Sequence, residues 1–159
     1  FDLTLTSYPR TLAAPPAPPK AGDPAPPLEA LDVVRAGSSA APDWEQQRHL
    51  LFFWATWCGP CKASLAELED WSERSGVPVL AVSDEDPATL RKFLDGWDGP
   101  FPQRVASDGM RTAHLSFGIS GTPTFVLVDA EGKVEWRQVG YSKRTGLAIP
   151  GWTWSAPDK

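Results

Sequence analysis

The chain has 159 residues, of which 42% are hydrophobic, and a formal net charge of -5 at pH 7. This length suits one globular domain with its own core. The acidic balance argues against binding to nucleic acid or to an anionic membrane surface, and no apolar run is long enough to cross a bilayer. Because the sequence begins at Phe1 and shows no signal peptide, we expect a mature or excised fragment of a longer gene product.

The N-terminal part is rich in proline and alanine. Residues 9–27 hold eight prolines, which exclude a helix or a central strand and favour extended polyproline conformation. We therefore interpret residues 1–27 as an arm or linker and residues 28–159 as the folded domain, with a disordered tail as the alternative interpretation of the arm. Residues 1–6 alternate apolar with polar side chains, which is typical of a strand.

Two strands are predicted next, over residues 28–34 and 50–55. The second run is apolar throughout, which is typical of a strand that is covered on both faces. The only two cysteines, Cys58 and Cys61, follow within a few residues. After them, apolar residues recur at intervals of three, which predicts a helix that ends at Gly76.

The spacing Cys58-x-x-Cys61 between a strand and a helix puts both sulfurs at a helix N-terminus. Exposed N–H groups and the helix dipole favour a negative charge there, and a thiolate is such a charge. The thiol of Cys58 should therefore ionise and react more readily than a free cysteine. The pattern predicts dithiol–disulfide exchange, with Cys58 as the more exposed, attacking thiolate and Cys61 as the more buried, resolving thiol.

Three other interpretations of the pair are weaker. A structural zinc site needs four ligands, and the two histidines, His49 and His114, lack paired-ligand spacing. A structural disulfide stabilises most when it closes a long loop, and this loop is very short. Two inert buried cysteines would not need Gly-Pro between them. We therefore expect no metal, and we interpret His114 as a packed or surface side chain.

The second half of the sequence alternates strands with helices. Asp86 and Pro87 suit an N-cap and a first helical turn. The predicted elements are a strand over 79–82, the helix that begins at Asp86, a helix over 108–117, and strands over 125–128 and 134–140. This order predicts a sheet that contains parallel strands, carries helices on both faces and ends in an antiparallel pair.

Glycine and proline interrupt the C-terminal residues. They allow at most a short helix over residues 142–148. Trp152 and Trp154 lie beyond it and would share one surface in an extended chain. We favour packing of both tryptophans on the domain over a partner-binding patch.

Two motifs give the chain a family resemblance. Trp57-Cys58-Gly59-Pro60-Cys61-Lys62 resembles the active site of thioredoxin, and Gly121-Thr122-Pro123-Thr124-Phe125 is similar to the cis-proline loop that faces the cysteines in that superfamily. The segment between them resembles the TlpA/ResA/DsbE-like branch. The resemblance covers residues 22–145 and implies an α/β fold, a thioredoxin-like three-layer α/β/α sandwich with a central mixed sheet and an N-terminal extension.

The resemblance also implies roles near the cysteines. Thr122 and a cis Pro123 would contact an extended client peptide. Trp57 would face the client, whereas Trp54 would belong to the core. The residues expected to support the active site are Trp57, Gly59, Pro60 and Lys62.

Two carboxylates of the relatives are missing here. Phe52 stands where thioredoxin has an aspartate, and Ser64 stands where the ResA-like branch commonly has a glutamate. Those carboxylates are thought to carry a proton to or from the resolving cysteine. The candidates to replace them are Glu67, Asp84 and Glu85, of which Glu67 is expected to be a solvated helix residue.

The resemblance implies a periplasmic or otherwise extracytoplasmic oxidoreductase whose full-length form is either secreted or membrane-anchored. It would reduce disulfides of client proteins, for example in cytochrome c maturation, without a cofactor. Its expected partners are a client with a disulfide or dithiol and an upstream electron donor such as a membrane thiol-disulfide transporter. We expect a monomer. The alternatives are a disulfide oxidase or isomerase, and a redox-idle binding domain of a larger membrane protein.

Overall fold

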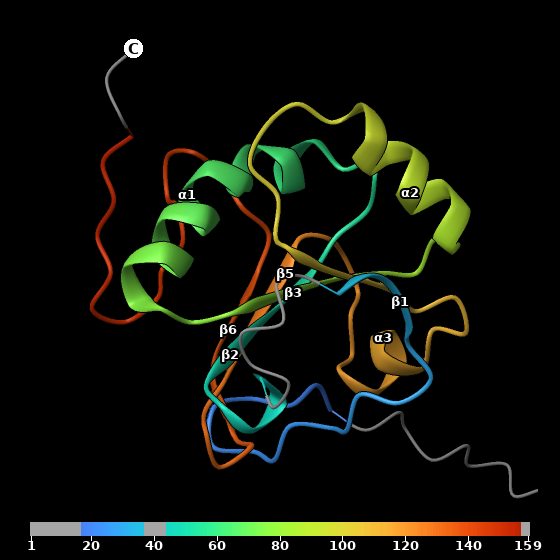
Figure 1. The fold of residues 1–159 in the computed structure, drawn as a ribbon. Helices are drawn as coiled ribbons and strands as arrows, with labels where there is room; N and C mark the ends of the chain where they lie inside the picture. Colours follow the sequence, from blue (N-terminus) through green and yellow to red (C-terminus); the bar gives the residue numbers. More distant parts are fainter. Residues whose placement is uncertain (1–16, 37–43, 157–159) are drawn as a thin grey trace, which may run out of the picture.

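A computed structural model describes residues 17–36 and 44–156, and its centre is one six-stranded mixed sheet (Figure 1). The strands are β1 (Asp32–Ala36), β2 (His49–Phe53), β3 (Val79–Ser83), β4 (Arg104–Ser107), β5 (Thr124–Val128) and β6 (Val134–Val139). Their order across the sheet is β1-β4-β3-β2-β5-β6. The strands β2, β3 and β4 are parallel, whereas β1, β5 and β6 are antiparallel to their neighbours.

Helices cover both faces of the sheet, as predicted. The helices are α1 (Gly59–Ser75), α2 (Pro87–Gly96) and α3 (Thr112–Ser116), with a 3₁₀ helix η1 at Trp44–Gln46. In Figure 1, α1 and α2 lie on one side of the sheet and α3 lies on the other. This is the thioredoxin-like three-layer arrangement that the sequence predicts.

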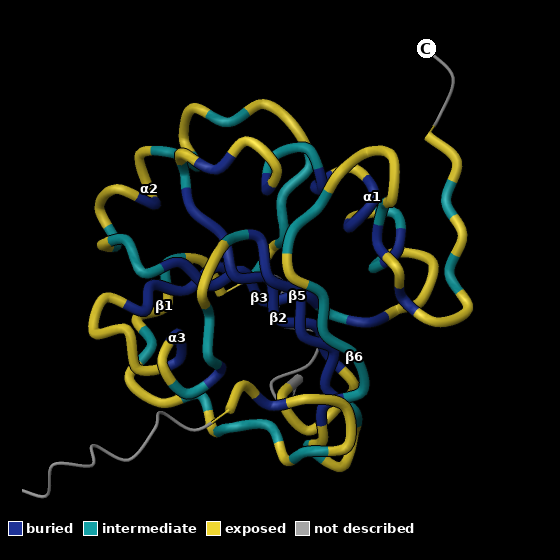
Figure 2. Tube along the Cα trace, turned by 180° about the vertical axis from the view of Figure 1, so that it is seen from behind, coloured by how far each residue is buried: buried dark blue, intermediate teal, exposed yellow. Residues whose placement is uncertain are grey.

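The central strand β2 separates two apolar cores. Phe52 and Trp54 pack into the cluster beneath α1 and α2, while Leu51 and Phe53 pack into the cluster on the side of α3. Successive side chains of a strand point to opposite faces, so a strand buried on both faces must be apolar throughout. Figure 2 shows this central part of the sheet buried.

Local signals fix the ends of the two longer helices. The carboxylate of Asp86 accepts a hydrogen bond from the Thr89 N–H (3.3 Å) and caps α2, as predicted. Hydrogen bonds from the Thr89 hydroxyl and backbone lower the pKa of Asp86. Helix α1 ends at Gly76, whose φ of 73° lies in the left-handed region that glycine adopts without strain.

The shorter elements differ from prediction. Helix α3 begins four residues later than expected, because Asp108 lies outside it and accepts hydrogen bonds from the N–H groups of Ala113 and His114. Strand β1 lies at 32–36 instead of 28–34. The C-terminal segment contains turns and no helix between residues 142 and 156.

Part of the N-terminal arm runs beside the β5–β6 hairpin. The N–H groups of Gly22 and Ala25 donate to the carbonyls of Val134 and Gly132, at 2.8 Å each, and Val134 N–H donates to Asp23 O. These bonds make this part of the arm a covering segment. The strand predicted over residues 1–6 lies outside the described residues, and the domain boundary at residue 27 stays a prediction.

Candidate redox site

The two cysteines form a disulfide at the start of α1. The sulfurs are 2.14 Å apart and the Cα atoms 5.3 Å apart. Cys58 is the N-cap residue, and its Sγ accepts a hydrogen bond from the Cys61 N–H at 3.2 Å. Pro60 stands in the first helical turn, where its missing N–H costs nothing. The helix N-terminus therefore points a donor at the sulfur of Cys58, as the motif predicts.

Both sulfurs are covered, while the residues around them are open. Cys58 is 3% exposed and Cys61 is 1% exposed, so both cysteines are buried in the disulfide form and Cys58 is only slightly the more exposed of the two. The cause is packing, because both cysteines belong to the apolar cluster beneath α1. Trp57 is 75% exposed beside them, and Gly59 and Pro60 are exposed as well.

The proline loop precedes β5 at the same end of the sheet at which the cysteine loop follows β2. Thr124, the first residue of β5, pairs with Phe53, the last residue of β2, and the Thr122–Pro123 bond is cis, as predicted. Pro123 is buried, and its carbonyl accepts a hydrogen bond from the Gly140 N–H at 2.7 Å. Thr122 is half-buried.

Comparison with known proteins settles the family. The model of the Redoxin family matches residues 20–151. The chain belongs to the Redoxin family. This agrees with the thioredoxin-like resemblance of its two motifs.

The relatives of this redoxin include named disulfide-exchange proteins. Thiol-disulfide oxidoreductase ResA of Oceanobacillus iheyensis is 31% identical over 123 residues, which cover 73% of this chain and 63% of that protein. The DsbE homolog of Paracoccus denitrificans, a thiol:disulfide interchange protein, is 32% identical over 92 residues, 57% of this chain and 50% of that protein. The chain therefore spans only half to two thirds of the length of these relatives.

A solved structure supports the fold. The structure described as a thiol:disulfide interchange protein DsbE from Chlorobium tepidum has a TM-score of 0.61 with this redoxin at 28% identity. The match covers 80% of this chain and 90% of that chain. No helix among residues 17–36 and 44–156 is long and apolar enough to span a membrane.

The two positions that lack a carboxylate hold a phenylalanine and a hydrogen-bonded serine in this redoxin. Phe52 is buried and stacks on Phe125 at 5.4 Å between ring centroids. Ser64 is buried on the same face of α1 as Cys61, and its hydroxyl donates to the Cys61 carbonyl at 2.7 Å. Neither side chain is a base at neutral pH, so neither replaces the missing carboxylate.

Glu67 has a structural role, contrary to the prediction that it is solvated. Its side chain is 2% exposed and accepts three hydrogen bonds, each at 2.9 Å, from the Tyr141 hydroxyl, the Leu147 N–H and the Trp152 Nε1–H. Burial and the Glu67 carboxylate raise the pKa of Tyr141. Because these donors occupy both carboxylate oxygens, Glu67 holds the C-terminal segment and is a poor proton carrier for Cys61.

The C-terminal tryptophans pack on α1, as predicted. Trp152 donates to Glu67, and Trp154 Nε1–H donates to the Asp70 carboxylate at 2.6 Å. The guanidinium of Arg74 lies over the Trp152 ring, 5.7 Å from its centroid. The segment after β6 thus packs against α1.

The loops after β2 and β3 are joined by a carboxylate. Glu85 accepts the Thr56 N–H at 2.7 Å and the Thr56 hydroxyl at 2.6 Å. The neighbouring Asp84 pairs with Arg111 at 2.6 Å. The sequence indicated Asp84 and Glu85 only as candidate bases, and it did not reveal Thr56 as the partner of Glu85, although Thr56 lies just before the cysteine motif.

Two further predicted residues have clear environments. His114 is buried, with Nδ1 at 2.7 Å from the Asp108 carboxylate and its ring edge-on to Phe53. This confirms a packed histidine. Lys62 is half-buried, and its ammonium lies 5.6 Å from the centroid of the Phe93 ring. In the described residues no three His, Cys, Asp or Glu side chains gather as a metal site.

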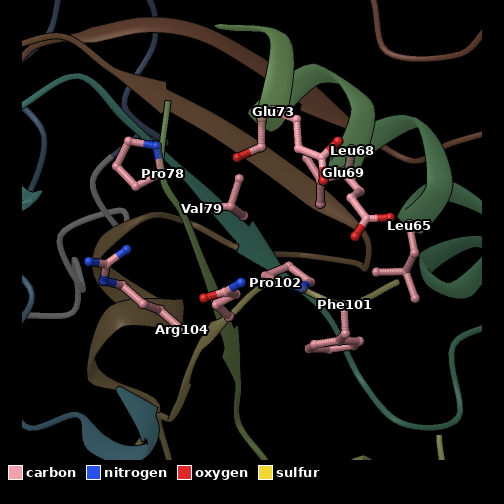
Figure 3. Close-up of a pocket in the computed structure, with 11 residues that line it drawn as sticks. Leu65, Leu68, Glu69, Glu73, Pro78, Val79, Phe101, Pro102 and Arg104 are labelled. Carbon is pink, nitrogen blue, oxygen red and sulfur yellow. The ribbon is translucent and has the colours of Figure 1, made fainter. Parts of the chain in front are cut away.

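A cavity of about 270 Å³ lies beside α1, away from both cysteines. Figure 3 shows Glu69 and Glu73 of α1 on one side of it and Arg104 of β4 on the other. Partial desolvation and the charges of Glu73 and Asp70 raise the pKa of Glu69. Neither cysteine lines this cavity.

Proposed function

We propose that this redoxin is a thiol-disulfide oxidoreductase that works through Cys58 and Cys61. The observation that carries the proposal is the disulfide at the N-terminus of α1, with the Cys61 N–H directed at Cys58 Sγ. A donor and a helix dipole at this position stabilise a thiolate. The names of the ResA and DsbE relatives agree with this chemistry.

The reaction passes two electrons between the chain and a client. In the reducing direction the Cys58 thiolate attacks a client disulfide, forms a mixed disulfide and releases one client thiolate. Cys61 then loses its proton and attacks Cys58 Sγ. The second client sulfur leaves as a thiolate, and the Cys58–Cys61 disulfide is restored. The client gains two electrons, and protons from solvent neutralise its thiolates.

The client is a protein with an accessible disulfide. Trp57 offers an exposed aromatic surface beside the sulfurs, and such residues often anchor protein interfaces. Thr122 is half-buried and precedes the cis Pro123, where its backbone could pair with an extended peptide. We therefore assign Trp57 and Thr122 to client contact, with Gly59 leaving the approach to the sulfur open.

We further propose that the protein acts outside the cytoplasm and in the reducing direction, with an upstream thiol donor that keeps it reduced. Gly-Pro between the cysteines resembles reducing thioredoxins, and the ResA and DsbE names support an extracytoplasmic setting. Apocytochrome c is a candidate client, and a membrane thiol-disulfide transporter is a candidate donor.

The reduction potential tests the direction of electron flow. A potential near about -270 mV supports a reductant, whereas one near about -120 mV supports an oxidase. A Cys61→Ser variant should capture clients as mixed disulfides in an extracytoplasmic extract. A Cys58→Ser, Cys61→Ser double variant is the matched control, and equal capture by both would contradict exchange at this site.

A further inference from the structure

One carboxylate bonds directly to the loop that carries Cys58. Glu85 Oε1 accepts the Thr56 N–H at 2.7 Å and the Ser83 hydroxyl at 3.0 Å, and Oε2 accepts the Thr56 hydroxyl at 2.6 Å. Thr56 is two residues before Cys58. Because two donors belong to Thr56 in the loop after β2 and the third is Ser83 at the end of β3, the carboxylate joins this loop to the end of β3.

Glu85 is itself held in place through its backbone. Its N–H donates to the Ser83 hydroxyl at 3.2 Å, and its carbonyl accepts the Ser107 hydroxyl at 2.6 Å. Ser83 and Ser107 are fully buried, and the side chain of Glu85 is half-buried. A carboxylate held in this way stays near one position, unlike a mobile charge on the surface.

Glu85 bonds to a residue that is close to Cys58 along the chain. Consecutive Cα atoms are about 3.8 Å apart, so Thr56 and Cys58 lie within about 8 Å of each other. This is comparable with the Debye length of about 8 to 10 Å at ordinary ionic strength, so salt weakens a charge interaction over this range without abolishing it. The carboxylate therefore opposes the N-terminus of α1, which favours a negative charge on Cys58.

We propose that Glu85 is a positioning residue of the redox site that fixes the loop before Cys58 through Thr56 and whose negative charge makes the Cys58–Cys61 pair more reducing. The proposal rests on the proposed dithiol–disulfide exchange. Reduction of the disulfide adds two electrons and yields two thiols, of which Cys58 can lose its proton. A charge that disfavours the thiolate disfavours the reduced form and drives the electrons toward a client.

Other charged groups at this edge have different partners. Asp84 pairs with Arg111, Asp86 caps α2 in an exposed position, and Lys62 lies over an aromatic ring. Glu85 differs from these groups because it bonds to the cysteine loop itself. This difference supplies a matched control, since Asp84 and Glu85 are adjacent carboxylates.

The test is the equilibrium of the purified proteins with reduced and oxidised glutathione at pH 7. Glu85→Gln should favour the reduced form by about three- to tenfold, which corresponds to a rise of about 15 to 30 mV in potential. Its alkylation by iodoacetamide should also reach half of its maximal rate at lower pH. Asp84→Asn removes the same charge and should give less than half of this shift. A Glu85→Gln potential equal to that of the wild type or of Asp84→Asn would overturn the proposal.

Two variants separate charge from loop geometry. Thr56→Val loses the hydroxyl contact but keeps the charge, so its melting temperature should fall while its equilibrium stays within about twofold of the wild type. Glu85→Asp keeps the charge with a shorter reach and should also stay near the wild type. A shift in either variant as large as that of Glu85→Gln would refute the electrostatic role. A wild type that does not exchange with glutathione would instead contradict the proposed function.

Discussion

A carboxylate that accepts several hydrogen bonds lies near the N-terminus of α1, and another lies in the middle of this helix. The two regions of α1 differ in what the carboxylate does. At the N-terminus of α1, a covered disulfide lies beside the exposed Trp57, and Glu85 holds the preceding loop. Farther along, the buried Glu67 binds the segment after β6, which has no regular structure between residues 142 and 156. A carboxylate near the cysteines thus acts on chemistry, whereas a carboxylate two turns away acts on stability. The donors around each carboxylate decide which role it has.

The largest effect should come from the redox end. Cys58→Ser should abolish reduction of a protein disulfide such as that of insulin, because the attacking thiolate is lost. Cys61→Ser should accumulate a mixed disulfide, since the resolving thiol is missing. Mass spectrometry of the reduced wild type after brief alkylation at neutral pH checks the order. Preferential labelling of Cys61 would reverse the assignment.

The second largest effect should be a loss of stability without a change in redox chemistry. Glu67→Ala should lower the free energy of unfolding by about 3 kcal/mol, because one buried and two partly buried donors lose a charged acceptor. Urea denaturation measures this loss, and the reduction potential should stay unchanged. Glu73→Ala, on an exposed part of the same helix, should change stability by less than about 0.5 kcal/mol. A reduction potential that changes in Glu67→Ala would show that Glu67 also affects the cysteine pair.

A smaller effect is expected on client recognition. Trp57→Ala should slow the reaction with a protein disulfide by about tenfold, since an exposed aromatic contact is worth more than about 1 kcal/mol when it is buried by a partner. Stopped-flow mixing with a disulfide-bonded protein measures the rate. The reaction with oxidised glutathione should change little. Val33→Ala, an exposed residue on β1, should leave both rates unchanged, and equal slowing of both substrates by Trp57→Ala would argue against client contact.

The step in which Cys61 attacks the mixed disulfide should depend on pH. Burial of Cys61 favours its neutral thiol, and the Ser64 hydroxyl, which donates to the Cys61 carbonyl, is no base. We expect slow resolution that speeds up as pH rises. Ser64→Glu should flatten this dependence and cost stability in a dry site. Stopped-flow measurement across pH decides, and a wild-type rate that is fast and flat near neutrality would show that another base serves Cys61.

The smallest effect concerns His49, the first residue of β2. Burial lowers the pKa of His49 below its usual 6.5, so the unfolded chain binds a proton more readily than the folded one. Stability should therefore fall as pH drops below about 6.5 and through the folded-state pKa. His49→Gln should reduce this loss in thermal unfolding between pH 7 and pH 5. An unchanged pH dependence would point to other groups.

The sequence by itself determined the elements whose signals are local. The strand, cysteine pair and helix around Cys58 lie within one short stretch, and the Asp86 cap and the Gly76 end of α1 depend on immediate neighbours. These signals sufficed for the layered fold and for the position of the disulfide. They also placed Trp54 inside and Trp57 outside correctly.

Only the tertiary structure decided the roles of the carboxylates and the burial of Cys58. Glu67 meets donors that are 74 to 85 residues away in sequence, and Glu85 meets Thr56 across 29 residues. Helical periodicity gives a residue's position on its own helix but not which distant segment will cover it. A glutamate on α1 therefore looks solvated until the C-terminal segment packs over it, and burial then makes its hydrogen bonds necessary.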